Sequence, residues 1–368
     1  MITVTKPDLP PLEEYMEYLK KIWTSKWLTN DGEYVQSLKR KLEEHLKTKD
    51  LVLVSNGTLA IELALKVLNI KGEVITSPFT FPATTNSILW EKLTPVFADV
   101  DPETFNIDPR EVEKRITQKT SAILAVHVFG NPCYVKELQE IAHRHDVKLI
   151  YDAAAAFDVE YENQSVLNYG DLSILSFHAT KVFHTVEGGA IAVKDERLCE
   201  KLSLLRDHGI KSAEHVAIVG TNAKMNEFQA VMGICNLKYV DKRIQRRKRL
   251  YEYYNRRLSK HVKFQKLTAS KYNYGCMPVC FEDIEERDKV HSRLLKNGIE
   301  PRKYFFPLTT SSDYFKKEGA DLVKKYDLRN AYDISNRILC LPLYPDLKTQ
   351  DVNRVIKIIE DTLDTKES

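Results

Sequence analysis

Two residues of the chain have types and settings that suit one kind of chemistry. Asp152 ends an apolar run over residues 147–151, and Lys181 follows a second run that ends in Ser176-Phe177-His178. A desolvated lysine amine can bond to an aldehyde, and a buried carboxylate can keep a pyridine nitrogen protonated. Proteins use pyridoxal phosphate as an electron sink through these two groups. The pair therefore predicts that cofactor, with Lys181 as its attachment point and catalytic base.

A candidate phosphate site lies earlier in the chain, at Ser55-Asn56-Gly57-Thr58-Leu59, between a predicted strand and a predicted helix. Backbone N–H groups at a helix N-terminus, together with a hydroxyl group, suit a phosphate, and glycine allows a close approach. The alternative is an ordinary helix N-cap, with Ser55 or Thr58 as the capping residue. The segment alone fits both interpretations.

Two further residues after predicted strands could contact the cofactor. Phe81 could stack on the pyridine ring, and Ser176 could donate a hydrogen bond to the phosphate. Taken alone, Phe81 is more typical of a core residue. His178 fits a packed histidine and is given no catalytic role.

The elements that position these residues alternate between short apolar runs and helical periodicity. This alternation predicts an α/β domain with a mainly parallel seven-stranded sheet between helices. The predicted strands are residues 51–54, 73–76, 95–100, 122–128, 147–152, 172–177 and 189–193. Ligands of such sheets bind beyond the carboxyl ends of the strands. Asn56, Phe81, Asp152 and Lys181 all fall at or just after such ends.

The remainder of the chain predicts a smaller C-terminal α+β domain. Residues 226–260 form one long helical region, and short strands at 277–281 and 338–341 alternate with helices at 285–295 and 349–363. We divide the chain into a large domain, 1–240, and a linking helix with the small domain, 241–368. The basic run 242–249 is interrupted by apolar residues at helical spacing, which favours a solvated or subunit-facing helix over a nucleic-acid site.

Composition excludes several classes of function. The 368 residues carry a net charge of +3, are 43% hydrophobic, and contain no apolar stretch long enough to cross a bilayer. The N-terminus lacks the pattern of a signal peptide. The six cysteines form no C-x-x-C pair, so we expect reduced, packed thiols, no metal site and a cytoplasmic location. No nucleic-acid or membrane partner is predicted.

Motifs along nearly the whole chain resemble the DegT/DnrJ/EryC1/StrS family of sugar aminotransferases, which have the type I fold of pyridoxal-phosphate enzymes. The resemblance rests on these segments in order: Trp27-Leu28-Thr29-Asn30-Asp31-Gly32, residues 73–85, His127-Val128-Phe129-Gly130-Asn131-Pro132, Asn222 to Ala230, and Leu341-Pro342-Leu343-Tyr344-Pro345.

The resemblance implies a role for each matching residue. Lys181 bonds to the cofactor, Asp152 pairs with the pyridine nitrogen and Phe81 stacks on the ring. The phosphate-end set is Gly57, Thr58, Leu59 and Ser176, with Asn222 reaching in from a second subunit, so a homodimer with shared active sites is expected. Looser candidates for the substrate side are Thr29, Asn30, Lys224, Asn226 and Tyr304.

The implied reaction moves an amino group from L-glutamate to a keto-sugar nucleotide. Relatives that remove a sugar hydroxyl carry histidine at the position of Lys181, so the lysine favours transamination. The overall likeness is to enzymes that convert dTDP-4-keto-6-deoxy-D-glucose to dTDP-4-amino-4,6-dideoxy-D-glucose. A C3 aminotransferase and a non-catalytic cofactor or nucleotide-sugar binder are the alternatives. A nicotinamide-dependent dehydrogenase is disfavoured, because no G-x-G-x-x-G follows a strand.

The chain departs from the family pattern at two positions. Ala155 stands where relatives have the histidine or glutamine that bonds the ring hydroxyl of the cofactor. Asp158 stands where glycine is common. The first change predicts looser cofactor binding, by about 1 kcal/mol for one lost hydrogen bond. The second indicates a local feature of the loop.

Overall fold

A seven-stranded sheet lies at the centre of the large domain in the computed structural model, which describes residues 1–364. Its order is β2-β10-β9-β6-β5-β3-β4, and every neighbouring pair is parallel except those of β10, which is antiparallel to β2 and β9. The strands are β2 (Leu51–Val54), β3 (Glu73–Thr76), β4 (Thr94–Phe97), β5 (Thr120–Val126), β6 (Lys148–Asp152), β9 (Leu172–Ser176) and β10 (Gly189–Val193). The predicted mainly parallel seven-stranded sheet is confirmed.

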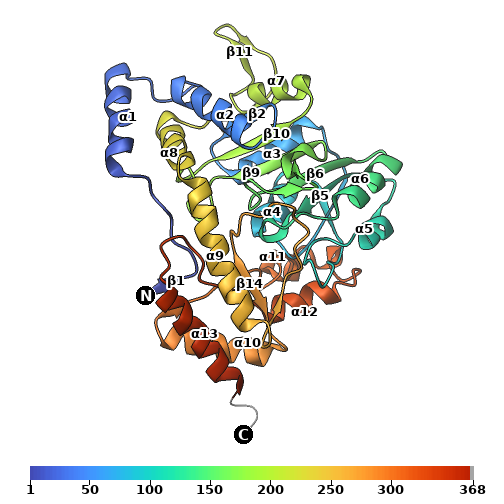
Figure 1. Ribbon diagram of the computed structural model, residues 1–368. Coiled ribbons are helices and arrows are strands. Elements are labelled where there is room, and N and C mark those ends of the chain that lie inside the picture. The colour runs from blue at the N-terminus through green and yellow to red at the C-terminus, as the bar shows by residue number, and fades with distance from the viewer. Residues whose placement is uncertain (365–368) are drawn as a thin grey trace.

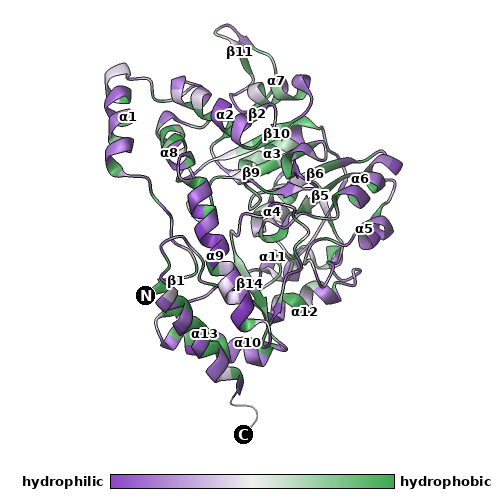
Figure 2. Ribbon diagram, viewed as in Figure 1, coloured by the Kyte–Doolittle hydropathy of each residue, from purple (hydrophilic) through white to green (hydrophobic). Residues whose placement is uncertain are grey.

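Helices cover both faces of this sheet, because alternate strand residues are buried on opposite sides. Val52 and Val54 pack on one side, with α3 (Gly57–Val67), α4 (Pro82–Trp90) and α7 (Glu196–Leu205). Leu51 and Leu53 pack on the other. That second side is covered by α2 (Glu33–His45), α8 (Glu227–Leu237), α5 (Pro109–Arg115) and α6 (Val135–Arg144). Figure 2 shows hydrophobic strands inside and hydrophilic outer helix surfaces.

The helical region predicted over 226–260 is two helices rather than one. Helix α8 is followed by a turn at Lys238 and Tyr239, and α9 (Val240–Leu258) then runs from the large domain to the small one (Figure 1). Helix α1 (Leu12–Ser25) stands to one side and packs against α8. The hairpin of β11 (Ile210–Ser212) and β12 (His215–Val216) projects from the far end of the large domain.

The small domain is an antiparallel sheet with helices, as predicted. Its strands are β13 (Lys263–Phe264), β14 (Met277–Cys280) and β16 (Ile338–Leu341), and its main helices are α10 (Ile284–Lys296), α12 (Arg329–Arg337) and α13 (Thr349–Leu363). Strand β1 (Ile2–Thr3) pairs with β15 (Ile299–Glu300), so the first residues contact the C-terminal part of the chain. The division at residue 240 remains a proposal.

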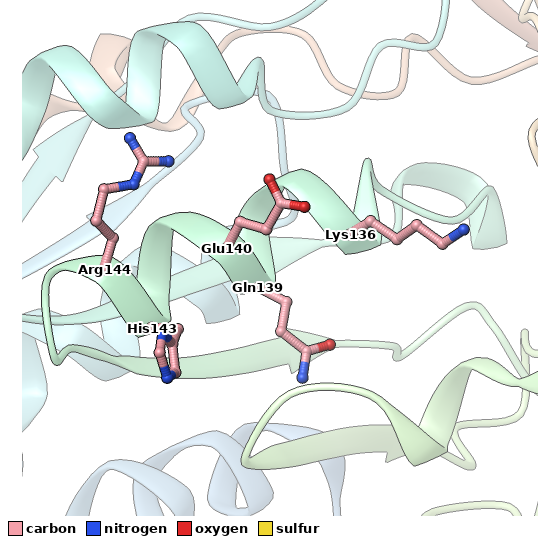
Figure 3. A pocket seen from close by; sticks show the side chains of 5 residues that line it. All are labelled: Lys136, Gln139, Glu140, His143 and Arg144. Carbon is pink, nitrogen blue, oxygen red and sulfur yellow. The ribbon is translucent and has the colours of Figure 1, made fainter.

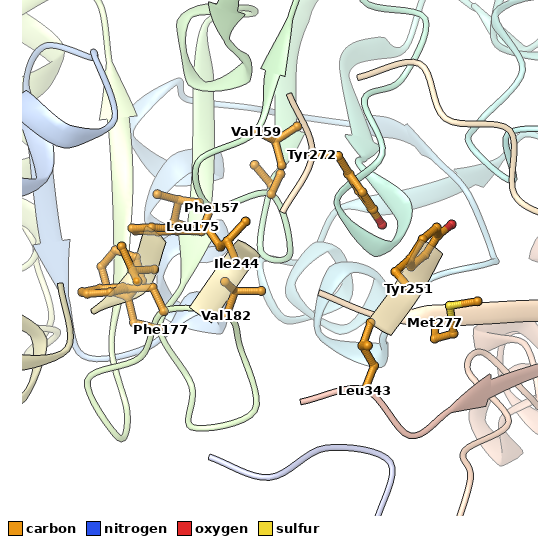
Figure 4. Close-up of a cluster of buried hydrophobic side chains, with 14 of the residues drawn as sticks. Phe157, Val159, Leu175, Phe177, Val182, Ile244, Tyr251, Tyr272, Met277 and Leu343 are labelled. Atoms are coloured by element: carbon orange, nitrogen blue, oxygen red, sulfur yellow. The ribbon is translucent and has the colours of Figure 1, made fainter. Parts of the chain in front are cut away.

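One buried cluster joins the two parts of the chain. It includes Phe157 and Phe177 of the large domain, Ile244 and Tyr251 of α9, and Met277 of β14 (Figure 4). Because these side chains share one core, α9 is held against both the site loops and the small domain.

The basic run of α9, predicted to be a solvated or subunit-facing helix face, is partly buried within the chain. Arg243 and Arg247 are buried, and each donates to backbone carbonyls far away in the sequence. The nearest carbonyl to Arg247 is that of Leu343, at 2.8 Å. Burial lowers the pKa of Arg247 to about 10. The helical period places these two arginines on the inner side of α9, whereas Lys242, Gln245 and Arg249 are exposed, so the prediction is wrong for the two buried arginines only.

All six cysteines are free, as expected from their spacing. Within residues 1–364, no helix combines the length and the apolar character needed to cross a membrane.

Candidate active site

Asp152 ends β6, and its carboxylate lies on the α4 side of the sheet. The residue is only 5% exposed. Its Oδ2 accepts a hydrogen bond from the Thr84 hydroxyl at 2.7 Å, and its Oδ1 accepts one from the backbone N–H of Ala154 at 3.1 Å. A carboxylate can accept about four hydrogen bonds, so one further donor can be accommodated. The buried charge is thus oriented by two donors before any ligand binds.

Lys181 lies in the loop between β9 and β10, beyond the carboxyl end of β9. The loop is closed by two backbone hydrogen bonds, from Phe177 to Gly188 at 2.8 Å and from Thr185 to Phe177 at 2.9 Å. No side-chain hydrogen bond or ion pair formed by residues 1–364 involves Nζ of Lys181. Burial raises the pKa of Cys276, which lies just before β14, and the charge of the nearby Lys181 partly offsets this rise.

The start of α3 lies beside the end of β9. A Cβ atom at Gly57 would lie 3.0 Å from Cβ of Ser176, so only glycine allows this separation comfortably. The cap of α3 is Asn56, whose side chain accepts from the N–H of Leu59 at 2.8 Å; the expected caps, Ser55 and Thr58, are therefore wrong. Thr58 is exposed, so its hydroxyl is free to face a ligand at this helix end.

Phe81 comes directly before α4 and is 59% exposed. The interpretation of Phe81 as a core residue is therefore wrong. Its carbonyl accepts from the N–H of Thr84, the same residue whose hydroxyl contacts Asp152. The exposed ring is thus placed one helical turn from the buried carboxylate.

Ala155 has no polar side-chain atom, and the neighbouring amide of Asn273 has no free N–H to take the place of the missing donor. The side chain of Asn273 donates to the carbonyls of Ala155 and Phe157 at 2.9 and 2.8 Å and accepts from Gly275 at 3.0 Å. The backbone of Ala155 is held, because a Cβ at Gly130 would lie 2.6 Å from its carbonyl oxygen. The backbone at this position is fixed, but the side chain offers no hydrogen-bond donor or acceptor.

The looser substrate-side candidates are spread over several elements. Thr29 and Asn30 are exposed before α2, and Tyr304 is half-buried in the small domain. Lys224 forms an isolated bridge with Val54 at the end of β2 and pairs with Asp207. The Oδ1 of Asn226 accepts from the backbone N–H of Gln229 in a capping box, and its amide N–H₂ group remains available for a ligand.

Asn222 comes directly before Ala223, whose carbonyl accepts from the backbone N–H of Ser55 at 2.8 Å. It is exposed on the large domain, next to the segment that pairs with β2. A role for it in a second subunit's site remains a prediction.

Sequence reasoning missed two residues that support the site. Thr84 orients Asp152, and its place one helical turn after Phe81 was the available signal. His127 stacks on Tyr151 with ring centres 4.6 Å apart, and its backbone N–H donates to the carbonyl of Asp152 at 3.0 Å. Burial lowers the pKa of His127 to about 3, so the imidazole is neutral.

A surface hollow lies elsewhere, beside α6. Figure 3 shows the side chains that line it: Lys136, Gln139, Glu140, His143 and Arg144. None of the predicted site residues lines this hollow, so it does not belong to the candidate site.

Comparison with known proteins places the chain among aminotransferases. It belongs to the DegT/DnrJ/EryC1/StrS aminotransferase family, which matches residues 12–360. It is 39% identical over 365 residues to a dTDP-4-amino-4,6-dideoxy-D-glucose transaminase of Shigella dysenteriae, covering 98% of each chain.

Two solved structures show the same fold. DesI, crystallised in the presence of its TDP-sugar product, superposes with a TM-score of 0.91 at 29% identity, over 100% of this chain and 94% of DesI. NtdA of Bacillus subtilis, with bound cofactor PMP, superposes with a TM-score of 0.88 at 25% identity, over 96% and 82%. The predicted family and fold are confirmed.

Proposed function

We propose that this aminotransferase depends on pyridoxal phosphate and acts on a nucleotide-linked keto-sugar. The observation that carries the proposal is the pairing of a buried, oriented carboxylate, Asp152, with a lysine, Lys181, whose amine has no partner within residues 1–364. Both lie at the same edge of the sheet. The structure of NtdA with bound PMP supports the choice of cofactor.

The residues around this pair fit the shape and charge of that cofactor. The phosphate would be held by N–H groups in the first turn of α3, by Thr58 and by Ser176, with the missing Cβ of Gly57 leaving room. Phe81 offers an exposed aromatic face. Asp152 would accept a hydrogen bond from the ring nitrogen. When bound, the cofactor supplies an electron sink for the carbanion formed at the amino-bearing carbon.

Lys181 and Asp152 then have separate tasks. The amine of Lys181 would hold the cofactor between turnovers. Once released, it would take the proton from the amino-bearing carbon of the donor in the first half-reaction and deliver a proton to the sugar carbon in the second. The carboxylate of Asp152 keeps its partner nitrogen protonated, and the Thr84 hydroxyl and the Ala154 N–H keep that carboxylate in place. Burying the carboxylate of Asp152 costs free energy when no opposite charge is paired with it. Holding it in place is useful at a site where a reaction develops charge, because fixed polar groups then stabilise that charge.

We further propose L-glutamate as the amino donor and dTDP-4-keto-6-deoxy-D-glucose as the acceptor, giving dTDP-4-amino-4,6-dideoxy-D-glucose. The 39% identity to the Shigella transaminase over nearly the full chain supports this choice. A C3 aminotransferase acting on a dTDP-3-keto-6-deoxyhexose is the alternative, because no residue of the site distinguishes the two carbons.

A homodimer with shared sites completes the proposal. Trp23 in the last turns of α1 is 69% exposed and Trp27, just after that helix, is 58% exposed, so this end of α1 offers apolar surface for a second subunit to cover. Mixing Lys181→Ala chains with Asn222→Glu chains tests the sharing. The mixture is expected to regain activity, because one of its two sites has both native residues. Equal inactivity of the mixture and of each variant alone would contradict shared sites.

The reaction is tested with purified protein reconstituted with pyridoxal phosphate. The near-visible absorption band of the lysine-linked cofactor is expected, and L-glutamate should bleach it. Incubation with L-glutamate and each keto-sugar nucleotide, followed by NMR of the product, then locates the new amine. A protein that shows no cofactor band refutes the whole proposal, whereas an amine at C3 refutes only the choice of substrate.

A further inference from the structure

Three side chains remote in the sequence converge at the C-terminal end of α2. His45 ends α2, Asp158 lies in the loop after β6, and Asp241 lies in the first turn of α9. The Nε2 atom of His45 is 3.8 Å from Oδ2 of Asp158 and 3.9 Å from Oδ1 of Asp241. All three ligand atoms lie within 4.8 Å of one another.

Two of these atoms are buried without a hydrogen-bond partner among residues 1–364. They are Nε2 of His45 and Oδ2 of Asp158, which belongs to a carboxylate only 5% exposed. The other oxygen of Asp158 pairs with Nζ of Lys271 at 2.6 Å. That ion pair fixes the carboxylate and leaves Oδ2 directed at His45. A buried polar atom left unsatisfied costs roughly 1–3 kcal/mol, so this arrangement calls for an occupant.

The backbone at Asp158 strengthens the case. Its φ is +57°, in the left-handed region that favours glycine. The chain therefore keeps a carboxylate where a residue without a side chain would be less strained. The ion pair with Lys271 does not by itself explain the carboxylate, because Lys271 is half-exposed and water would solvate its charge without Asp158.

We propose that His45, Asp158 and Asp241 form a binding site for a divalent cation, with zinc as the best match. Two atoms that bind one zinc ion at about 2.0–2.2 Å can lie at most about 4.4 Å apart. Both distances from His45 meet this limit, and the oxygens of Asp158 and Asp241 lie within 4.8 Å of each other, so a small shift of the exposed Asp241 completes the set. One imidazole with two carboxylates suits zinc better than magnesium or calcium, which prefer oxygen ligands alone. Asp241 is 77% exposed, which gives the ion access from solvent.

The charges around the site permit a cation. The two carboxylates contribute −2 and Lys271 contributes +1, while Lys47 nearby is paired with Glu160 at 3.0 Å. A bound ion would join α2, the loop after β6 and the start of α9. The ring of His45 stacks on Phe157 at 5.7 Å, and Phe157 stacks on Phe183, two residues after Lys181, at 4.6 Å. The site is therefore placed to rigidify the surroundings of the Lys181 loop.

Zinc binding to the full-length protein tests the proposal, whatever its catalytic activity. After dialysis against a chelator, with matched cofactor content in all samples, isothermal titration calorimetry with zinc should show one site per chain. Zinc should also raise the melting temperature. Both variants should fold, because Asp158→Gly places glycine at a backbone conformation that favours it and Asp241→Asn changes an exposed side chain. Each is expected to weaken zinc binding at least tenfold and to remove the thermal shift.

His143→Ala is the matched control, because His143 is also a histidine near an acidic residue, Glu140, but lies in the hollow on α6. It should bind zinc like the native protein. Cobalt in place of zinc reports on the ligands directly through its visible absorption. The spectrum of bound cobalt should differ from that of the native protein in His45→Ala and should be unchanged in His143→Ala. The proposal is overturned if native protein fails to bind zinc at millimolar concentration, or if Asp158→Gly and Asp241→Asn bind it as tightly as native protein.

Discussion

Ala155→His should tighten the binding of pyridoxal phosphate. The backbone at this position is held by the hydrogen bond from Asn273 at 2.9 Å and by the close approach of Gly130, so a new imidazole would project from a fixed point. Asn273 uses both of its amide N–H groups on backbone carbonyls and so has no donor left for the cofactor's ring hydroxyl in the native chain. The substitution therefore adds a donor where none exists.

The expected gain follows from the value of one hydrogen bond to a charged or partly charged oxygen. Such a bond contributes about 1–2 kcal/mol net, which corresponds to a roughly 5–30-fold lower dissociation constant. Titration of the apoprotein with pyridoxal phosphate, followed by absorbance, measures the constant. Ala155→Leu is the matched control, since it adds volume without a donor. An unchanged constant in Ala155→His would refute the reasoning, and so would equal tightening in Ala155→Leu.

Three further outcomes are expected. Lys181→Ala should abolish transamination and the near-visible cofactor band while leaving the urea midpoint near that of native protein, because Nζ has no partner to lose; a retained band would contradict its assignment. Asp152→Asn should keep the hydrogen bond from Thr84 but lower kcat with L-glutamate by about 10²-fold or more, and a loss below tenfold would remove Asp152 from its role. The lowered pKa of His127, about 3 against an ordinary 6.5, means that the unfolded chain takes up a proton there that the folded chain does not, so stability should fall as the pH drops from about 6.5 towards 3. His127→Phe should reduce this slope by about 1.4 kcal/mol per pH unit, as measured by urea unfolding at several pH values, and an unchanged slope would show that other groups cause it.

Local patterns were sufficient for the sheet and for the positions of the main site residues. Continuous apolar runs predicted buried strands, and the polar residues that follow them fell at the carboxyl ends, because parallel strands end at one edge. Residues 51–54, 73–76 and 189–193 match β2, β3 and β10 in both bounds. The family and its aminotransferase activity were also predicted from the sequence, because several short motifs of the family occur along the chain in the same order.

Local patterns failed where a side chain's surroundings come from distant segments. Phe81 was more typical of a core residue by composition, yet α4 leaves its ring exposed. Arg243 and Arg247 look solvated in a run of charges, but carbonyls of the N-terminal segment and of the small domain accept their hydrogen bonds. Burial of a charged side chain depends on partners that local sequence does not specify.

The sequence by itself determined the chemistry available to this protein: a lysine and an aspartate after neighbouring strands, a glycine at a helix start, and an alanine where relatives have a donor. Each of these follows from residue type and short-range order. Only the tertiary structure decided which groups meet. It brought Thr84 to Asp152, left Lys181 without a partner in the part of the chain that the structure describes, and assembled His45, Asp158 and Asp241 from three separate elements. The physical reason is that hydrogen bonds, ion pairs and ligand sites depend on distances of a few ångströms, which packing sets and sequence separation does not.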